Sequence, residues 1–186
     1  PNDAPHLLER LAAEQPGQRI QTSVRQALQR QTQALVNRYA REYSSNHIYN
    51  LAAIVADVET GEVLAYAGNA TYPADELRGN QVDIITSPRS TGSILKPFLY
   101  AGMLHDGLLL PSMLVSDVPL NINGFSPHNY NKTFYGAVPA HVAIERSLNV
   151  PLVRMLSQYN TGRFMSLLKS WGMTTLRFSE EHYGAS

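Results

Sequence analysis

With 186 residues, the chain is long enough to form one domain with a buried core, or part of a larger protein. Its 15 basic and 15 acidic residues cancel, which excludes the strong positive charge typical of proteins that bind nucleic acids or anionic membranes. No cysteine is present, so disulfides and thiol catalysis are excluded, and no apolar run reaches the roughly 20 residues that span a bilayer.

The first 43 residues predict a connector followed by a helix. Residues 1–22 contain leucines at helical spacing, and the helix-breaking pair Pro16-Gly17 ends this stretch. Residues 23–43 have apolar side chains on one helical face and Arg, Gln and Glu on the other, so we expect a one-sided helix that lies on a domain. The apolar positions are Val24, Ala27, Leu28, Leu35 and Tyr39.

A hairpin and a loop are predicted next. The stretches LAAIVADV (51–58) and VLAYAGN (63–69) have the composition of strands, and the intervening ETGE is a glycine-containing turn. Residues 72–88 are polar, with prolines at both edges, and predict an excursion loop.

The second half of the chain predicts mainly helices. Residues 90–107 have helical periodicity, and residues 142–159 contain two helical stretches that meet close to Pro151, which disfavours a continuous helix. Residues 108–140 are rich in Pro, Asn and Gly and predict a long loop with few strands, whereas residues 162–173 predict a final amphipathic helix. The apolar positions of the 90–107 helix are Ile94, Leu95, Phe98, Leu99 and Met103.

A serine three residues before a lysine occurs twice, as Ser93…Lys96 and Ser166…Lys169, which is about as often as chance predicts. Context favours the first pair. A serine at a helix start faces unpaired N–H groups and the positive end of the helix dipole, both of which favour an oxyanion. Lys96 has apolar neighbours, and burial lowers the pKa of a lysine so that its neutral amine can act as a base. Ser166 lies in mid-helix, where a structural role is expected.

The sequence Ser147-Leu148-Asn149 lies where a helical run breaks. Two polar side chains at such a break can both face a cleft, where the hydroxyl relays a proton and the amide holds a substrate peptide group. Helix capping is the alternative interpretation, because both residue types favour helix ends. For the similar sequence Ser44-Ser45-Asn46, capping is the preferred interpretation.

Together, STGSILKPF and RSLNVP resemble the first two motifs of the serine acyltransferases that include penicillin-binding proteins and β-lactamases. The resemblance extends to IQTSVRQALQ, AAIVADVETGEVLAYAGN, FSPHNYN and APHLLERL. These segments resemble the transpeptidase domain of class A bifunctional penicillin-binding proteins and the connector before it, with the 1C type of Gram-negative bacteria as the closest likeness. The implied fold class is α+β, a penicillin-binding or serine β-lactamase-like transpeptidase fold.

The resemblance implies a peptidoglycan D,D-transpeptidase that needs no metal or cofactor. Ser93 would be the nucleophile that attacks a D-Ala-D-Ala stem peptide, and Lys96 its general base. Ser147 would pass a proton to the departing amine, and Asn149 would bind the acyl chain and orient Lys96. A second stem peptide would supply the acceptor amine, and β-lactams would acylate Ser93 and inhibit the enzyme.

The chain also departs from the family pattern. The third motif, Lys-Ser/Thr-Gly on a core strand, is missing, and Lys132-Thr133-Phe134 precedes the second motif and lacks its glycine. We therefore expect residues 1–22 to be an inter-domain linker after a missing glycosyltransferase domain, and residues 23–186 to be the N-terminal part of a transpeptidase domain. This fragment alone would be inactive or nearly so, because the second oxyanion donor lies on the missing strand. A companion chain or segment would complete it at the periplasmic face of the inner membrane, where a missing N-terminal segment would anchor the protein.

Alternative functions stay open at this point. The domain could be a D,D-carboxypeptidase, a β-lactamase or a β-lactam sensor, although the connector and introducing helix argue against these. It could also be a non-catalytic binding or scaffold module with relic site residues. A third alternative is an unrelated α+β protein in which both motifs are helix ends. None of the six histidines has the spacing of a metal site.

Overall fold

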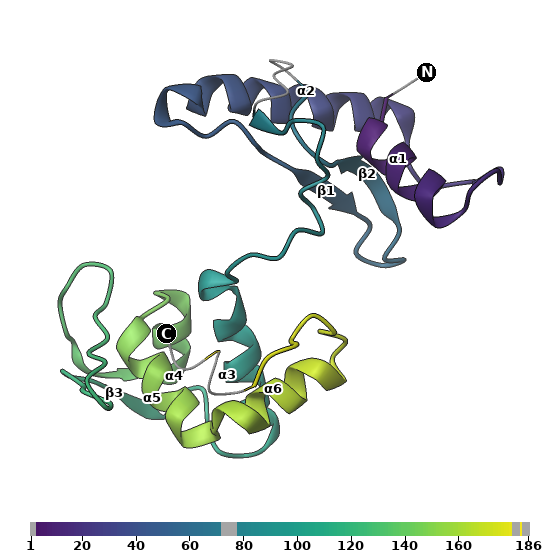
Figure 1. The fold of residues 1–186 in the computed structure, drawn as a ribbon. Coiled ribbons are helices and arrows are strands. Elements are labelled where there is room, and N and C mark those ends of the chain that lie inside the picture. Colours follow the sequence, from purple (N-terminus) through teal and green to yellow (C-terminus); the bar gives the residue numbers. More distant parts are fainter. Residues whose placement is uncertain (1–2, 72–77, 180–182, 184–186) are drawn as a thin grey trace. The chain divides into compact units, whose positions relative to one another are not determined.

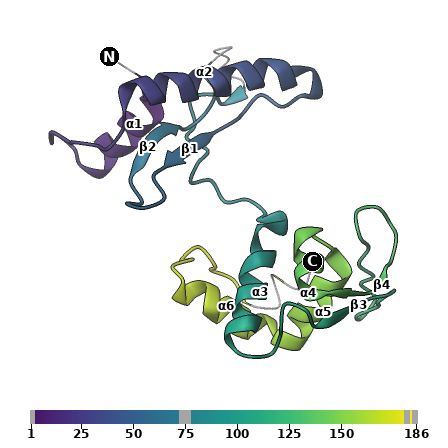
Figure 2. The same cartoon turned by 180° about the vertical axis from the view of Figure 1, so that it is seen from behind.

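The computed structural model describes residues 3–71, 78–179 and 183. The chain divides into two compact units, Pro1–Arg89 and Ser90–Ser186, whose elements are labelled in Figure 1 and shown from behind in Figure 2. No helix in the described part of the chain is both long enough and apolar enough to cross a membrane.

The first unit is an antiparallel hairpin covered by helices. Its two strands pair as the hairpin that the sequence predicts, with Ala53 opposite Ala67. The register of the pairing shifts after Val55. The turn is held by Asp57, whose carboxylate accepts from two backbone N–H groups, and by Gly61, whose φ of 72° favours glycine. The elements are α1 (Pro5–Glu14), α2 (Gln26–Glu42), the 3-10 helix η1 (Tyr43–Asn46), β1 (Ala53–Ala56) and β2 (Val63–Ala67).

The buried face of α2 differs from the predicted one. Leu35 and Tyr39 are 51% and 37% exposed, and Ala27 is also exposed, whereas Gln29, Thr32, Val36 and Ala40 are buried. Gln29 is fully buried because its amide pairs with the backbone of Tyr66, accepting from its N–H at 2.7 Å and donating to its carbonyl at 3.0 Å. The core-facing side of α2 therefore includes a hydrogen-bonded polar residue, and the prediction that Ala27, Leu35 and Tyr39 face the core is wrong.

The predicted loop 72–88 is described only from Arg78 onward, where the chain forms turns, and residues 72–77 lie outside the described part. Whether residues 1–22 act as an inter-domain linker stays a prediction.

The second unit combines helices with one short antiparallel pair of strands, as Figures 1 and 2 show, and the mixed helix and strand content confirms the α+β class. Leu114 in β3 pairs with Pro139 in β4, and the two helices predicted between residues 142 and 159 are present. The break between them lies at residues 146–148, and Pro151 is in the first turn of the second helix. Its elements are η3 (Gly92–Leu95), α3 (Lys96–His105), β3 (Leu114–Asp117), β4 (Gly136–Pro139), α4 (Ala140–Glu145), α5 (Asn149–Tyr159) and α6 (Thr161–Ser170).

Helix α3 supplies the core of this unit through Leu99 and Met103, which are 4% and 2% exposed. Ile94 and Phe98 belong to the predicted apolar face, but they are 70% and 42% exposed, so that part of the prediction is wrong. Ile94 lies in the 3-10 turn before α3, which has fewer residues per turn than an α-helix. Phe98 lies in α3 beside the buried Leu99, and its ring contacts Trp171.

Candidate active site

The first motif lies at the junction of η3 and α3. Gly92 has a φ of 54°, which favours glycine, and Ser93 follows it in the 3-10 turn. Lys96 is the first residue of α3, and its backbone N–H donates to the carbonyl of Ser93. Because a 3-10 helix has three residues per turn, Ser93 and Lys96 lie on the same face of this turn. Pro97 lies in the first turn of α3, where a proline is tolerated.

The second motif lies between α4 and α5. Ser147 has a left-handed backbone, with a φ of 50°. Its N–H donates to the carbonyl of Ile144 at 2.9 Å, and the N–H of Leu148 donates to the carbonyl of Ala143 at 2.9 Å. These two bonds form a Schellman motif, in which the left-handed position is usually a glycine. A serine in this strained conformation is typical of a functional position, since the backbone alone does not favour it.

Lys96 brings the two motifs together. Its Nζ donates to the carbonyl of Ser147 at 2.8 Å, to Oγ of Ser147 at 3.1 Å and to Oδ1 of Asn149 at 2.6 Å. Three of the four predicted site residues therefore meet in one cluster. In the described residues, no hydrogen bond joins the hydroxyl of Ser93 to this cluster, and Ser93 is exposed to solvent.

The protonation state of Lys96 depends on its burial and on its three oxygen contacts. Burial lowers the pKa of the Lys96 amine below its ordinary value of 10.5. The three oxygens that it contacts are all uncharged, and the carbonyl and the amide oxygen can only accept. The Ser147 hydroxyl can accept from an ammonium or donate to a neutral amine, so this contact is compatible with both protonation states of Lys96.

Asn149 is held from a second side by the loop that precedes β4. Its Nδ2 donates to the carbonyl of His128 at 2.9 Å. Its backbone N–H donates to Oδ1 of Asn129 at 2.9 Å, and Asn129 in turn contacts the buried carboxylate of Asp117. The sequence predictions did not include Asn129 and Asp117. The hydrogen bonds that join Asn129 to Asp117 and to Asn149 span 12 and 20 residues of the chain. Asn129 lies in the segment FSPHNYN, whereas Asp117 lies in no segment that the sequence analysis quoted.

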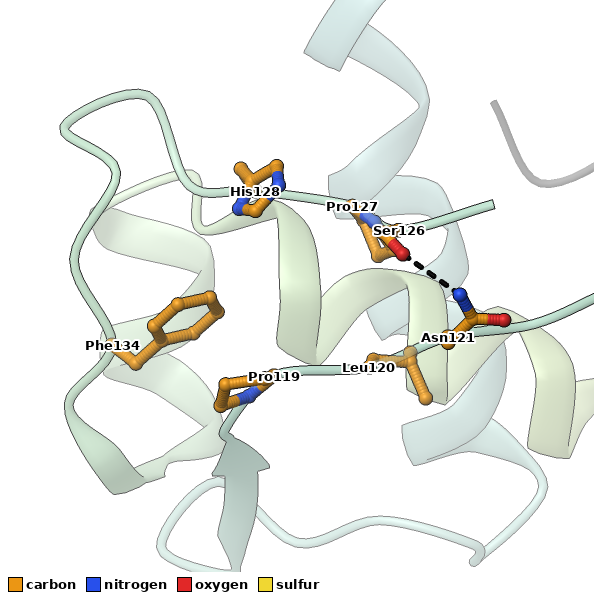
Figure 3. Close-up of a pocket in the computed structure, with 7 residues that line it drawn as sticks. All are labelled: Pro119, Leu120, Asn121, Ser126, Pro127, His128 and Phe134. Carbon is orange, nitrogen blue, oxygen red and sulfur yellow. Dashed lines mark hydrogen bonds between the residues drawn. The ribbon is translucent and has the colours of Figure 1, made fainter. Parts of the chain in front are cut away.

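A pocket of about 300 Å³ lies beside this loop. Figure 3 shows the Phe134 ring pointing inward toward Pro119 and His128, and an Asn121–Ser126 hydrogen bond of 3.0 Å on the other side. The loop that holds Asn149 through the His128 carbonyl therefore also forms a wall of this pocket.

The remaining matches to the motifs have structural roles. Oγ of Ser166 donates to the carbonyl of Gly162 at 2.9 Å, inside α6, and Lys169 is exposed. Oγ of Ser44 donates to the carbonyl of Arg41 at the end of α2. The segment Lys132-Thr133-Phe134 lies before β4 and not on a strand, so it does not replace the third motif.

Comparison with known proteins gives a consistent result. Residues 51–186 match the family model of the penicillin-binding protein transpeptidase domain. The chain is 32% identical over 173 residues to penicillin-binding protein 1C of Escherichia coli (strain K12), which covers 93% of this chain and 22% of that protein. The chain thus spans about a fifth of the length of this relative.

Two solved structures share the fold. One is the PonA1 protein of Mycobacterium tuberculosis in complex with penicillin V, with a TM-score of 0.62 at 20% identity, over 93% of this chain and 45% of that one. The other is penicillin-binding protein 1A of Haemophilus influenzae, with a TM-score of 0.59 at 24% identity, over 74% of this chain and 20% of that one. The fold and the family predicted from the motifs are confirmed. The chain belongs to the penicillin-binding protein transpeptidase domain family.

Proposed function

We propose that this chain is part of a peptidoglycan D,D-transpeptidase that works through an acyl-serine intermediate. The observation that carries the proposal is the position of Lys96. Its amine is partly buried, contacts only uncharged oxygens of the second motif, and lies on the same face of the 3-10 turn as Ser93. A lysine base beside a serine nucleophile is the requirement of this chemistry.

Acylation begins when Lys96 takes the proton of the Ser93 hydroxyl. Oγ of Ser93 then attacks the carbonyl carbon between the two D-alanines. The backbone N–H of Ser93 is one donor to the oxyanion that forms, and the second donor is expected on the Lys-Ser/Thr-Gly strand that completes the domain. When the tetrahedral intermediate collapses, the C–N bond breaks and the terminal D-alanine leaves as an amine. The acyl group stays on Ser93 as an ester.

Ser147 and Asn149 assist this step from the second motif. The Ser147 hydroxyl lies 3.1 Å from Nζ of Lys96, so it can pass the proton from Lys96 to the departing amine. The Asn149 amide uses its oxygen for Lys96 and one N–H for the His128 carbonyl. Its second N–H serves to bind a carbonyl of the substrate peptide, because an amide nitrogen carries two donors.

The second half-reaction forms the crosslink. An amine of a neighbouring stem peptide attacks the ester carbonyl, a new amide bond forms, and Oγ of Ser93 leaves and regains its proton through Lys96. The partners are therefore two stem peptides, a D-Ala-D-Ala donor and an amine acceptor. Penicillins resemble the donor and would acylate the same oxygen.

The location and the wider organisation follow from this substrate. We infer a protein that acts at the periplasmic face of the inner membrane, in which a glycosyltransferase domain precedes residues 1–22 and further residues with a Lys-Ser/Thr-Gly strand complete the domain. The relative from Escherichia coli is much longer than this chain, which spans 22% of it, and this supports a longer protein.

Intact-mass analysis of the full-length protein after incubation with penicillin V tests the proposal. We expect one covalent adduct, which peptide mapping places on the peptide that contains Ser93. Ser93→Ala should abolish the adduct. Ser166→Ala is the matched control, because it changes the other Ser-x-x-Lys pair, and it should leave the adduct unchanged.

The outcome separates the main alternatives. If the full-length wild-type protein gives no adduct on Ser93, the acyl-serine mechanism is wrong and a non-catalytic binding module is favoured. If the adduct forms, a D-Ala-D-Ala stem peptide with an amine acceptor distinguishes crosslinking from carboxypeptidase activity. The transpeptidase forms the new amide, whereas a carboxypeptidase releases only D-alanine and the hydrolysed peptide.

A further inference from the structure

Helix α5 begins in an unusual way, because its N-cap is supplied by a distant residue. The N-cap position itself is Leu148, which gives no side-chain cap and is buried in the core. Its side chain therefore contributes to packing and not to hydrogen bonding, and another residue must satisfy the first N–H groups of the helix.

All four of these N–H positions can be accounted for. The N–H of Leu148 donates to Ala143 within the Schellman motif, and Pro151 has no N–H. The remaining two, of Asn149 and Val150, both donate to Oδ1 of Asn129, at 2.9 and 3.2 Å. Asn129 lies 20 residues before Asn149 and is 3% exposed, so it is a buried external cap for the helix that carries Asn149.

The orientation of this cap is fixed by Asp117 at the end of β3. Asp117 is fully buried, and its two carboxylate oxygens accept from Nδ2 of Asn129 at 2.9 and 3.0 Å. One of them also accepts from the N–H of Tyr135 at 3.0 Å. Because an ionised carboxylate only accepts, it requires the NH₂ group of Asn129 to face it. The oxygen of Asn129 must then face α5, since a flipped amide would point donors at the helix N–H groups.

We propose that Asp117 and Asn129 are positioning residues for the reaction at Ser93. They hold the first turn of α5 so that Asn149 presents its oxygen to Lys96 at 2.6 Å. The carbonyl of His128, the residue before Asn129, holds the Asn149 side chain from the same loop. The inference rests on the proposed function for its kinetic readout, and it adds two residues outside both sequence motifs.

Asn129→Asp, Asp117→Asn and the double variant test the proposal in the full-length protein. Asn129→Asp keeps the acceptor toward α5 but places two carboxylates against each other. The amide donor to Asp117 is lost and a second acidic group is added. We expect its acylation rate constant with a fluorescent penicillin to fall by about 100-fold, the usual effect of misplacing a reacting group by 1 Å. The affinity for the penicillin before acylation should change far less.

The double variant Asp117→Asn/Asn129→Asp restores a donor facing a carboxylate, with their positions exchanged. We expect it to recover most of the lost acylation rate, although the Thr133 carbonyl loses the donor that Asn129 provides at 2.8 Å. Asn131→Asp is the control, because Asn131 lies in the same loop and is exposed, and it should acylate like the wild type. Thermal unfolding of every variant separates a rate effect from misfolding.

A second readout keeps this inference separate from the proposed function. The reactivity of Lys96 toward acetic anhydride, followed by mass spectrometry, needs no acylation of Ser93. Suppose that Lys96 becomes more reactive in Asn129→Asp and returns to the wild-type level in the double variant. Asp117 and Asn129 then position Asn149 against Lys96, even when no penicillin adduct forms. If Asn129→Asp is folded and matches the wild type in both acylation and Lys96 reactivity, the proposal is wrong.

Discussion

The two Ser-x-x-Lys pairs of this chain have the same spacing and lie in the same unit, yet their surroundings are opposite. Lys96 begins α3, is half-buried and contacts oxygens of residues 51 and 53 positions further along the chain. Lys169 lies in the last turn of α6 and is exposed, and Ser166 bonds back to its own helix. The difference shows that the spacing does not define the site. A second segment that surrounds the lysine defines it.

The helix dipole reinforces this contrast. Lys96 is at the N-terminal end of a helix, where the dipole is positive and disfavours a cation, so it acts in the same direction as burial. Lys169 is at a C-terminal end, where the dipole favours a cation. Burial and the helix dipole therefore both support the proposed role of Lys96 as a base, whereas Lys169 is exposed at the opposite end of its helix.

Replacing each lysine by alanine should give the largest difference in acylation rate between the two pairs. Lys96→Ala should lower the acylation rate of Ser93 by about 100-fold or more, because it removes a general base. Lys169→Ala should leave the rate unchanged. Both rates are measured with a fluorescent penicillin on the full-length protein. Equal rates in the two variants would show that Lys96 is not the base.

The pH dependence of acylation provides the next test. Only the neutral amine of Lys96 can accept the serine proton, so the rate should increase with pH and level off above the pKa of Lys96. Because burial lowers that pKa, the midpoint should lie below the ordinary lysine value of 10.5. Lys169→Ala should leave the midpoint in place. A midpoint at or above the ordinary value would contradict the assigned base.

The sequence predicted the elements well wherever local signals decide them. The hairpin at 51–69 has strand composition and a glycine turn. The break between α4 and α5 lies just before Pro151, which has no N–H to continue a helix from α4 and is tolerated in the first turn of α5. The buried face of α2 was not predictable in this way. Gln29 is buried because the backbone of Tyr66, 37 residues away, satisfies its amide, and periodicity of apolar residues carries no information about such a partner.

In the candidate site too, residues in local motifs were predictable and residues linked only by long-range hydrogen bonds were not. Ser93, Lys96, Ser147 and Asn149 could be identified because they form two short motifs, and the structure joins three of them through Lys96. Asp117 and Asn129 belong to no motif and are linked only by hydrogen bonds across the loop before β4. Aspartate and asparagine in a polar loop are usual turn residues, so their composition alone gave no reason to select them.

Replacing each serine by glycine and by alanine gives the smallest expected effect, and its sign should differ between the two pairs. Ser147 has a left-handed backbone, so glycine should be more stable than alanine there by about 1 kcal/mol. Ser166 lies within α6, where alanine should be more stable than glycine by about 1 kcal/mol. Thermal unfolding of the four variants measures both differences. Since glycine and alanine both lack the hydroxyl, each comparison isolates the backbone. If alanine is more stable than glycine at position 147 as well, Ser147 is not strained.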